Sequence, residues 1–225
     1  MIMKNDLSNM VLLAMLFLLL FALSEILYHR FKIRVEFTRK LVHIGTGIIS
    51  LLFPILLASH WSVLFLCGVF AVILVLSLKF NLLRSIHAID RKSAGSLAYP
   101  AAVYLCFVTQ TYLDDRNIFY YLPLATLAIC DPMAALSGKK WPLGPYMVLG
   151  AKKTVLGSIA FFISAIVLTF FIWKYAHDSS LDFQELTIIT TIALMATFAE
   201  ALSKDGYDNL TIPLSTIVSL YILLP

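Results

Sequence analysis

The sequence predicts an all-α, polytopic integral membrane protein, with a single domain over residues 1–225 and about eight (seven to eight) transmembrane helices. Of the 225 residues, 60% are apolar and only 13% are charged, which is about half the charged fraction of a soluble domain. Long apolar stretches recur along the whole chain, whose mean hydropathy is +0.90. Basic residues concentrate in every second loop between these stretches. These observations exclude a cytosolic enzyme, a disordered regulator and a nucleic-acid-binding module.

The apolar stretches place the predicted spans, because a helix needs about 20 apolar residues to cross a bilayer. The spans are expected at residues 9–28, 41–58, 61–77, 96–113, 118–136, 155–175, 185–202 and 211–224. The last is shorter than a bilayer requires and is expected to be a short or partial span. The first is too long for the apolar core of a signal peptide, and no small-residue cleavage site follows it.

The basic residues orient the predicted bundle. All Lys and Arg residues except Lys4, Arg116 and Lys174 lie in the loops that follow the first, third, fifth and seventh spans. The loops on the opposite side are short and acidic. By the positive-inside rule the basic face is cytoplasmic and, with an even number of spans, both termini lie outside. We therefore expect a multi-pass protein of the cell membrane.

The three cysteines, Cys67, Cys106 and Cys130, lie in apolar stretches. They lack the C-x-x-C spacing of a metal or redox site. They are expected to be small core residues.

Five polar clusters lie on the predicted cytoplasmic face, where polar residues that run into a span are costly to bury. The first contains Arg39, Lys40 and His43 at the start of the second span. On a helix, His43 shares a face with both basic residues because it lies three and four positions away from them. The alternative is that Arg39 and Lys40 bind lipid headgroups while His43 packs between helices.

Arg91, Lys92 and Ser93 begin the second cluster, a Ser/Gly-rich turn that leads into the fourth span. Such a turn presents free backbone N–H groups beside two cations, which is typical of an anion-binding site. An ordinary capped helix start with basic flanks is the alternative.

The third cluster is Asp131-Pro132, inside the fifth span. Proline removes a donor from the helical ladder, yet it is favoured at the first position of a helix that an aspartate caps. The pair is expected to break the span and to start a second half-helix at membrane depth. Irregular backbone at that depth is tolerated only where it is buried in protein or lines a cavity. Asp131 is therefore a candidate site residue.

The fourth cluster places Lys152 and Lys153 before Thr154, Gly157 and Ser158, at the start of the sixth span. Two cations, a threonine cap and a helix start with small residues favour phosphate binding. The segment is not a P-loop, because its glycine spacing differs and a membrane helix, not a strand, precedes it.

The fifth cluster runs from Glu200, at the end of the seventh span, through Ser203 to Asp208 and Asn209. A Glu200–Lys204 pair followed by a polar turn is the alternative. Across the five clusters, three candidate acids share one face with several cations. Phosphoryl transfer requires this combination, because carboxylates bind Mg²⁺ while cations bind the phosphates.

These residues resemble those of the membrane CTP-dependent lipid-alcohol kinases, a family that includes phytol kinase, dolichol kinase and CTP-dependent diacylglycerol kinase. The matching segments are RKLVHIGTG at 39–47, RKSAGSLAYP at 91–100, DPMAALSGKKWPLG at 131–144, AKKTVLGSIA at 151–160 and EALSKDGYDNLTIP at 200–213. They follow one order over most of the chain. The portion from Asp131 to Gly157 is also similar to phosphatidate cytidylyltransferase, although the long signature of that enzyme is not visible.

The resemblance implies transfer of the γ-phosphate of CTP to the hydroxyl of a membrane lipid alcohol. It implies Mg²⁺ as the cofactor, with Asp131 and Asp208 as ligands and Glu200 as an alternative ligand or base. It also implies catalytic roles for Lys153 and for His43, a candidate proton acceptor. The residues it implies around the nucleotide are Arg39, Lys40, Arg91, Ser93, Lys152, Lys153, Thr154, Gly157, Ser158 and Asn209. The small size of the chain favours a phytol or polyprenol type of substrate.

Two other functions remain open from the sequence. A phosphatidate cytidylyltransferase would use CTP on a phospholipid and release pyrophosphate. A small transporter would have a broken-helix substrate site near the bilayer midplane and internal repeats. The sequence shows no repeat, and its polar residues cluster at one interface.

Overall fold

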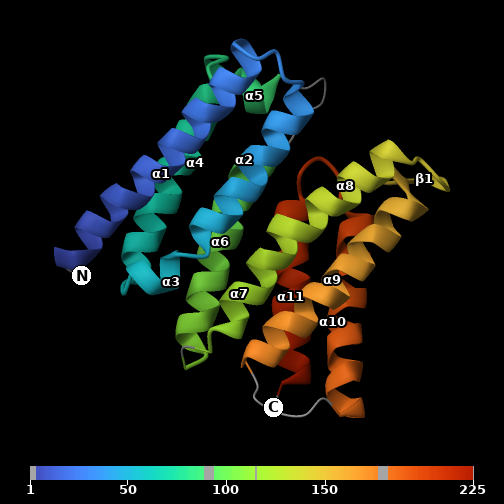
Figure 1. Cartoon of the computed structure of the whole chain (residues 1–225). Coiled ribbons are helices and arrows are strands. Elements are labelled where there is room, and N and C mark those ends of the chain that lie inside the picture. Colours follow the sequence, from blue (N-terminus) through green and yellow to red (C-terminus); the bar gives the residue numbers. More distant parts are fainter. Residues whose placement is uncertain (1–3, 89–93, 115, 177–181, 225) are drawn as a thin grey trace.

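The computed structural model describes residues 4–88, 94–114, 116–176 and 182–224. The described chain is helical except for one two-stranded hairpin and the connecting loops (Figure 1). The elements are α1 (Lys4–His29), α2 (Val35–Ser50), α3 (Phe53–Leu56), α4 (His60–Lys79), α5 (Arg84–His87), α6 (Gly95–Tyr112), α7 (Ile118–Ala125), the π-helix η1 (Thr126–Cys130), α8 (Asp131–Lys140), β1 (Pro145–Val148), β2 (Ala151–Thr154), α9 (Val155–Ala176), α10 (Phe183–Leu202) and α11 (Asp208–Leu223).

The all-α class with membrane-spanning helices is confirmed, while the count of eight spans is not. Every predicted span coincides with a helix, but within the described ranges six segments are long and apolar enough to cross a bilayer. These six are Asn5–His29, Val35–Leu56, His60–Lys79, Ile118–Lys140, Val155–Ala176 and Phe183–Leu202. The helix α6 is not among them, and α11 is a shorter apolar helix.

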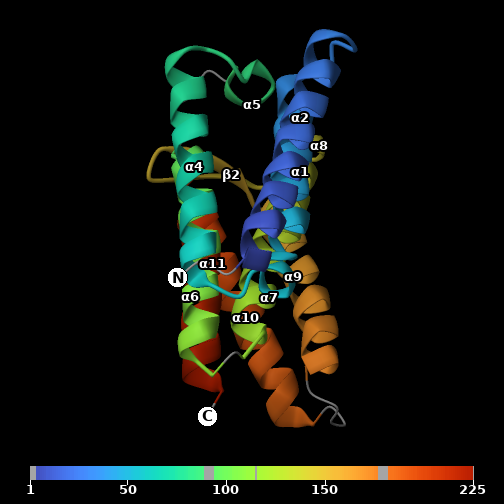
Figure 2. The ribbon, with the colours of Figure 1, turned by 90° about the vertical axis from the view of Figure 1, so that its left-hand side faces the viewer.

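The helices form two groups that meet along the middle of the bundle. In one group α1 packs on α2 and α4 packs on α6, and in the other α10 packs between α9 and α11. Figure 2 shows α4 and α6 following one another along one side, opposite α1 and α2. The loop after α1, the short helix α5, the hairpin and the turn before α11 lie toward one end, at the top of Figure 1. The loops predicted to share a basic face therefore share one end of the bundle.

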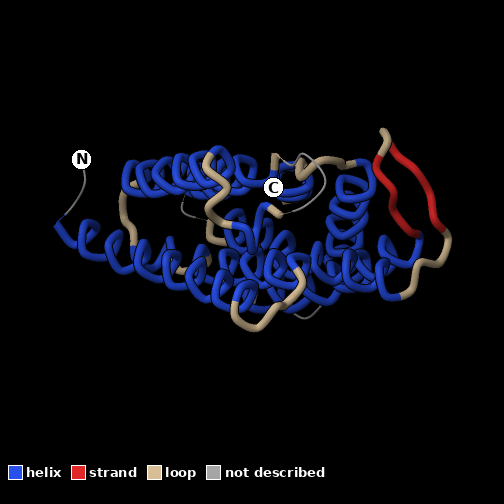
Figure 3. Tube along the Cα trace, turned by 90° about the horizontal axis from the view of Figure 1, so that it is seen from above, coloured by secondary structure: helices blue, strands red, loops and turns tan. Residues whose placement is uncertain are grey.

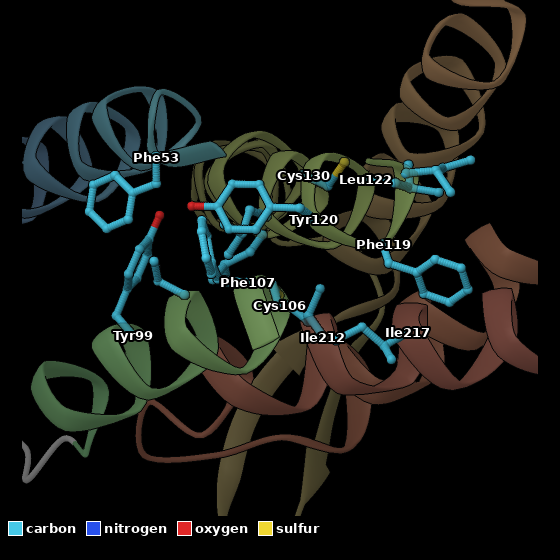
Figure 4. Packing of buried hydrophobic residues seen from close by; sticks show 14 of the residues in the cluster. Phe53, Tyr99, Cys106, Phe107, Phe119, Tyr120, Leu122, Cys130, Ile212 and Ile217 are labelled. Atoms are coloured by element: carbon cyan, nitrogen blue, oxygen red, sulfur yellow. The ribbon is translucent and has the colours of Figure 1, made fainter. Parts of the chain in front are cut away.

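The chain from α7 to α8 is the central helix of the bundle. Of its 18-residue spanning window 78% is buried, against 22–33% in the other five candidate spans. Figure 4 shows Phe119, Tyr120 and Leu122 of α7 among side chains of α6 and α11. All three cysteines are buried free thiols, as the sequence predicts. A helix that is mostly enclosed by its neighbours can hold polar groups away from lipid.

The hairpin is a feature that the sequence analysis does not predict. The sequence predicts only a loop between the spans at 118–136 and 155–175, whereas β1 and β2 pair antiparallel there, with Tyr146 opposite Lys153 and Met147 opposite Lys152. Figure 3 shows the hairpin at one edge of the molecule. Since successive side chains of a strand point to opposite faces, the two lysines diverge.

Close helix approach depends on glycine at Gly47 of α2. A Cβ atom added at Gly47 would lie 2.2 Å from Cβ of Ala128 and 3.0 Å from the Tyr99 hydroxyl oxygen. A side chain at this position would therefore push α2 away from η1, because packed interiors cannot absorb an extra carbon atom without displacement.

We predict that Gly47→Ala lowers the free energy of unfolding by about 1–3 kcal/mol, because it overpacks the contact between α2 and η1. The matched control is Gly68→Ala in α4, where an added Cβ meets no atom within 4 Å. That control should leave stability unchanged or raise it by up to about 1 kcal/mol, because alanine is the better helix former. Thermal unfolding of both variants in the same detergent measures the difference. Equal stability of the two variants would contradict the packing described.

Candidate active site

The candidate site begins at the helix irregularity around Asp131. The structure confirms that α8 starts at Asp131 with Pro132 in its first turn. It corrects the expectation of a broken span, because residues 118–140 form one continuous helical segment with η1 inserted in it. A π turn is wider than an α turn by one residue. The helix therefore accommodates the proline by widening, and it is not interrupted.

The π turn leaves one backbone carbonyl without its ladder partner. In π geometry the C=O of residue i accepts from the N–H of residue i+5, so the Leu127 carbonyl would require a donor at Pro132, which has none. His43 supplies the donor instead, with its Nε2 atom 3.0 Å from the Leu127 oxygen. Because a carbonyl only accepts, Nε2 carries the proton in this contact. The hydrogen bond to this carbonyl at the π turn thus fixes the orientation of the His43 ring.

Asp131 forms an ion pair with Lys40 of α2, a member of the first predicted cluster. Lys40 Nζ donates to Asp131 Oδ2 at 2.7 Å, and His43 Nε2 lies 3.5 Å from the same oxygen. The side chains of Lys40 and Asp131 are only 16% and 10% exposed. A charge pair removed from water interacts strongly, and either partner alone would be costly to bury. The pairing therefore holds the Asp131 carboxyl group at a fixed place inside the bundle.

A second buried ion pair lies beside the first. Lys153 Nζ, carried by β2, donates to Glu200 Oε1 of α10 at 2.5 Å and also to the Glu200 backbone oxygen. The other carboxylate oxygen, Oε2, is buried and has no hydrogen-bond partner in the described part of the chain. Lys152, the predicted companion of Lys153, is exposed instead. An unsatisfied buried carboxylate oxygen is a position where an incoming donor or cation gains the most.

The turn before α11 brings the last predicted cluster to the same place. Asp208 interacts electrostatically with Asp131, Lys153 and Lys40, and its side chain accepts from the Asn209 backbone N–H. Asn209 Nδ2 donates to the carbonyl of Gly95, at the start of α6. The predicted residues Arg91 and Ser93 lie outside the described residues.

The start of α9 is capped as expected. Thr154 Oγ1 accepts from the Gly157 backbone N–H at 3.1 Å, which satisfies one of the free donors of the first turn. Ser158 is hydrogen-bonded to Tyr146 of β1, with 2.7 Å between their hydroxyl oxygens. A Cβ at Gly157 would lie 3.1 Å from the Ala134 carbonyl oxygen, so glycine allows α8 and α9 to approach. The hairpin and both helices are thereby fixed around Lys153.

One cavity of about 1660 Å³ connects these groups. The predicted site residues that line it are Arg39, Lys40, His43, Asp131, Lys152, Lys153, Thr154, Gly157, Ser158, Glu200, Asp208 and Asn209. Pockets for one ligand usually measure about 300–1,000 Å³. The cavity is therefore large enough for two substrates at once.

Sequence reasoning missed two residues that shape the cavity wall. The Tyr99 ring stands edge-on to the His43 imidazole, with 5.2 Å between ring centroids, and its hydroxyl donates to the His43 carbonyl. His87 of α5, outside the membrane-spanning segments, also lines the cavity. Burial lowers the pKa of His87, against a smaller opposing effect of Glu25. The signs of Tyr99 in the sequence are its place beside a helix proline and within the segment RKSAGSLAYP that resembles the family.

The carboxylates fit a magnesium ion that shares its coordination with phosphate. In the described ranges, no three His, Cys, Asp or Glu side chains form a ready-made ion site. The three predicted ligands are therefore not assembled by the protein alone. Mg²⁺ in nucleotide enzymes usually takes one or two carboxylates and completes its octahedron with substrate phosphates and water. The unpartnered Glu200 oxygen and the neighbouring acids Asp131 and Asp208 are the carboxylates available there for such coordination.

Comparison with known proteins gives one informative relative. The chain is 32% identical to a phytol kinase of Synechocystis sp.. The 182 aligned residues cover 80% of this chain and 76% of that protein. No protein-family model and no solved structure matches the chain.

The two kinds of ion pair in the bundle predict a contrast in stability. Lys40→Met leaves Asp131 buried without its partner and should lower the free energy of unfolding by about 3–5 kcal/mol. Lys139→Met removes an ion pair with Glu36 whose side chains are 63% and 49% exposed, and should cost about 1 kcal/mol or less. Chemical denaturation in mixed micelles measures both. A Lys40→Met protein as stable as Lys139→Met would show that the pair with Asp131 is not formed.

Proposed function

The chain belongs to the family of CTP-dependent lipid-alcohol kinases, and on this premise we propose that it transfers the γ-phosphate of CTP to a membrane lipid alcohol of the phytol or polyprenol type. One observation carries the proposal: a single cavity combines two buried lysine–carboxylate pairs with a further acid beside them. Phosphoryl transfer depends on positioning and charge neutralisation, which this arrangement can supply. The concentration of basic residues at that end of the bundle supports a cytoplasmic site with both termini outside.

In this proposal, Lys153 and the start of α9 bind the triphosphate. An ammonium group and the N-terminal end of a helix both attract phosphate oxygens. Lys40 holds Asp131 in place, and Asp131 and Asp208 are the proposed ligands of Mg²⁺. When bound there, Mg²⁺ would neutralise charge on the β- and γ-phosphate oxygens.

The lipid hydroxyl is proposed to react beside Glu200. Its oxygen attacks the γ-phosphorus, the bond from that phosphorus to the oxygen bridging the β- and γ-phosphates breaks, and CDP leaves. The hydroxyl proton passes to Glu200 Oε2, the buried oxygen without a partner. His43 does not accept this proton at Nε2, because that atom already donates to the Leu127 carbonyl. Its proposed role is to position Asp131, whose Oδ2 atom lies 3.5 Å from Nε2.

The direct test is to supply the purified full chain with γ-labelled CTP or ATP and with phytol, farnesol, undecaprenol, diacylglycerol or phosphatidate. We expect labelled phosphoryl-alcohol and CDP from CTP with an isoprenoid alcohol. Transfer from ATP but not CTP would overturn the nucleotide assignment. Release of pyrophosphate with formation of a CDP-lipid from phosphatidate would identify a cytidylyltransferase instead.

Removing one charge from the proposed metal site should abolish transfer. Asp131→Asn keeps the size of the side chain and should lower kcat at least about 100-fold, since it removes a carboxylate from the site of charge development. Asp205→Asn, an exposed residue in the turn before α11, is the matched control and should retain full activity. Wild-type kcat in the Asp131→Asn protein would remove Asp131 from the mechanism.

A further inference from the structure

The cavity continues from the polar site into an apolar chamber inside the bundle. The same cavity that contains Lys40 and Asp131 is lined farther along by Phe17, Phe21, Phe53, Leu66, Phe70 and Leu74, from α1, α3 and α4. We call this part the tail chamber. Its wall residues are apolar, whereas the groups at the other end of the cavity are charged. The cavity thus has the polarity of an alcohol with one hydroxyl and a long hydrocarbon chain.

One face of α2 connects the two ends. His43, Thr46 and Ser50 all line the cavity, and Phe53 of α3 follows them. Their spacing of three to four residues places them in one row along the helix. At a rise of 1.5 Å per residue, His43 and Ser50 lie about 10 Å apart along α2, and Phe53 begins α3 after the turn that follows Ser50. A chain whose hydroxyl lies at His43 would therefore reach Phe53.

Three aromatic rings from α1, α3 and α4 meet in the wall of the tail chamber. The Phe17 ring lies 4.6 Å from that of Phe70 and 6.2 Å from that of Phe53, centroid to centroid. All three side chains are buried, and Phe53 is only 1% exposed. Rings in edge-on and tilted contact pack closely together. We call these three rings the floor of the tail chamber.

We propose that the tail chamber binds the hydrocarbon chain of the alcohol and that the floor formed by Phe17, Phe53 and Phe70 limits the length of that chain. The inference rests on the proposed function, because it assumes that the hydroxyl is phosphorylated at the polar end. An apolar chain is the fitting occupant, because the apolar wall holds the hydrocarbon away from the polar groups of the reaction site. By this proposal farnesol fits the chamber, whereas an undecaprenyl chain, which has nearly four times as many isoprene units, exceeds it.

The first test reads binding without catalysis. The full chain in nanodiscs is irradiated with a phytol analogue that carries a diazirine at the end of its chain, and the labelled peptides are sequenced. We expect label on peptides that contain Phe17, Phe53 or Phe70, and displacement of that label by unlabelled phytol. Label confined to outward-facing residues such as Phe65, or label that phytol does not displace, would overturn the proposal.

The second test reads selectivity through the transfer assay. Phe53→Leu, and in a separate protein Phe70→Leu, should raise the rate with undecaprenol relative to farnesol by about tenfold, the scale on which a hydrophobic pocket discriminates chain size. Phe65→Leu, on the exposed side of α4, is the matched control and should leave the ratio unchanged. An unchanged ratio in both floor variants would contradict the length limit.

The two tests separate the two proposals. Transfer from CTP with label only on the outer surface overturns the tail chamber and leaves the kinase assignment standing. Label in the chamber without CTP-dependent transfer overturns the kinase assignment and leaves the chamber standing.

Discussion

The structure depends on one constraint, which is the cost of placing Asp131 inside a helix bundle made for lipid. A carboxylate at that depth must be paired, and Lys40 of α2 supplies the pair across a contact far apart in the sequence. The pair brings α2 against the central helix and places His43 at the same carboxylate. Lys153 of β2 and Glu200 of α10 form a second buried ion pair on the side of the other group of helices. Two neutralised pairs concentrate four ionisable groups at one location, which is the combination that the proposed phosphoryl transfer requires.

The backbone around Asp131 is as important as its charge. The π turn and Pro132 leave the Leu127 carbonyl without a hydrogen-bond donor from its own helix, and His43 donates to it instead. Gly47 permits the approach of α2 that this bond requires. On the opposite side, the hairpin carries Lys153 toward α10, which a lysine on an irregular loop would reach only at a larger cost in conformational entropy. The local irregularities of the fold therefore coincide with the residues that the proposed mechanism uses.

Much of this arrangement follows from the sequence, because hydropathy and the distribution of Lys and Arg are local properties. They place the helices and gather the clusters at one end, and they identify Lys40, His43, Asp131, Lys153 and Glu200 as residues that belong together. The pairings do not follow, since they depend on which helices are neighbours. The expected break at Pro132 is wrong. A π turn holds one more residue than an α turn, and the helix therefore accommodates the proline without interruption. The hairpin was missed because its strands are only four residues long.

The most direct measurement is a structure of the full chain in nanodiscs with Mn²⁺ and a non-hydrolysable CTP analogue. The account predicts the metal between the analogue's phosphates and Asp131, with the triphosphate against Lys153 and the start of α9. Metal and phosphates bound at another surface, with the Lys40–Asp131 and Lys153–Glu200 pairs remote from both, would contradict it.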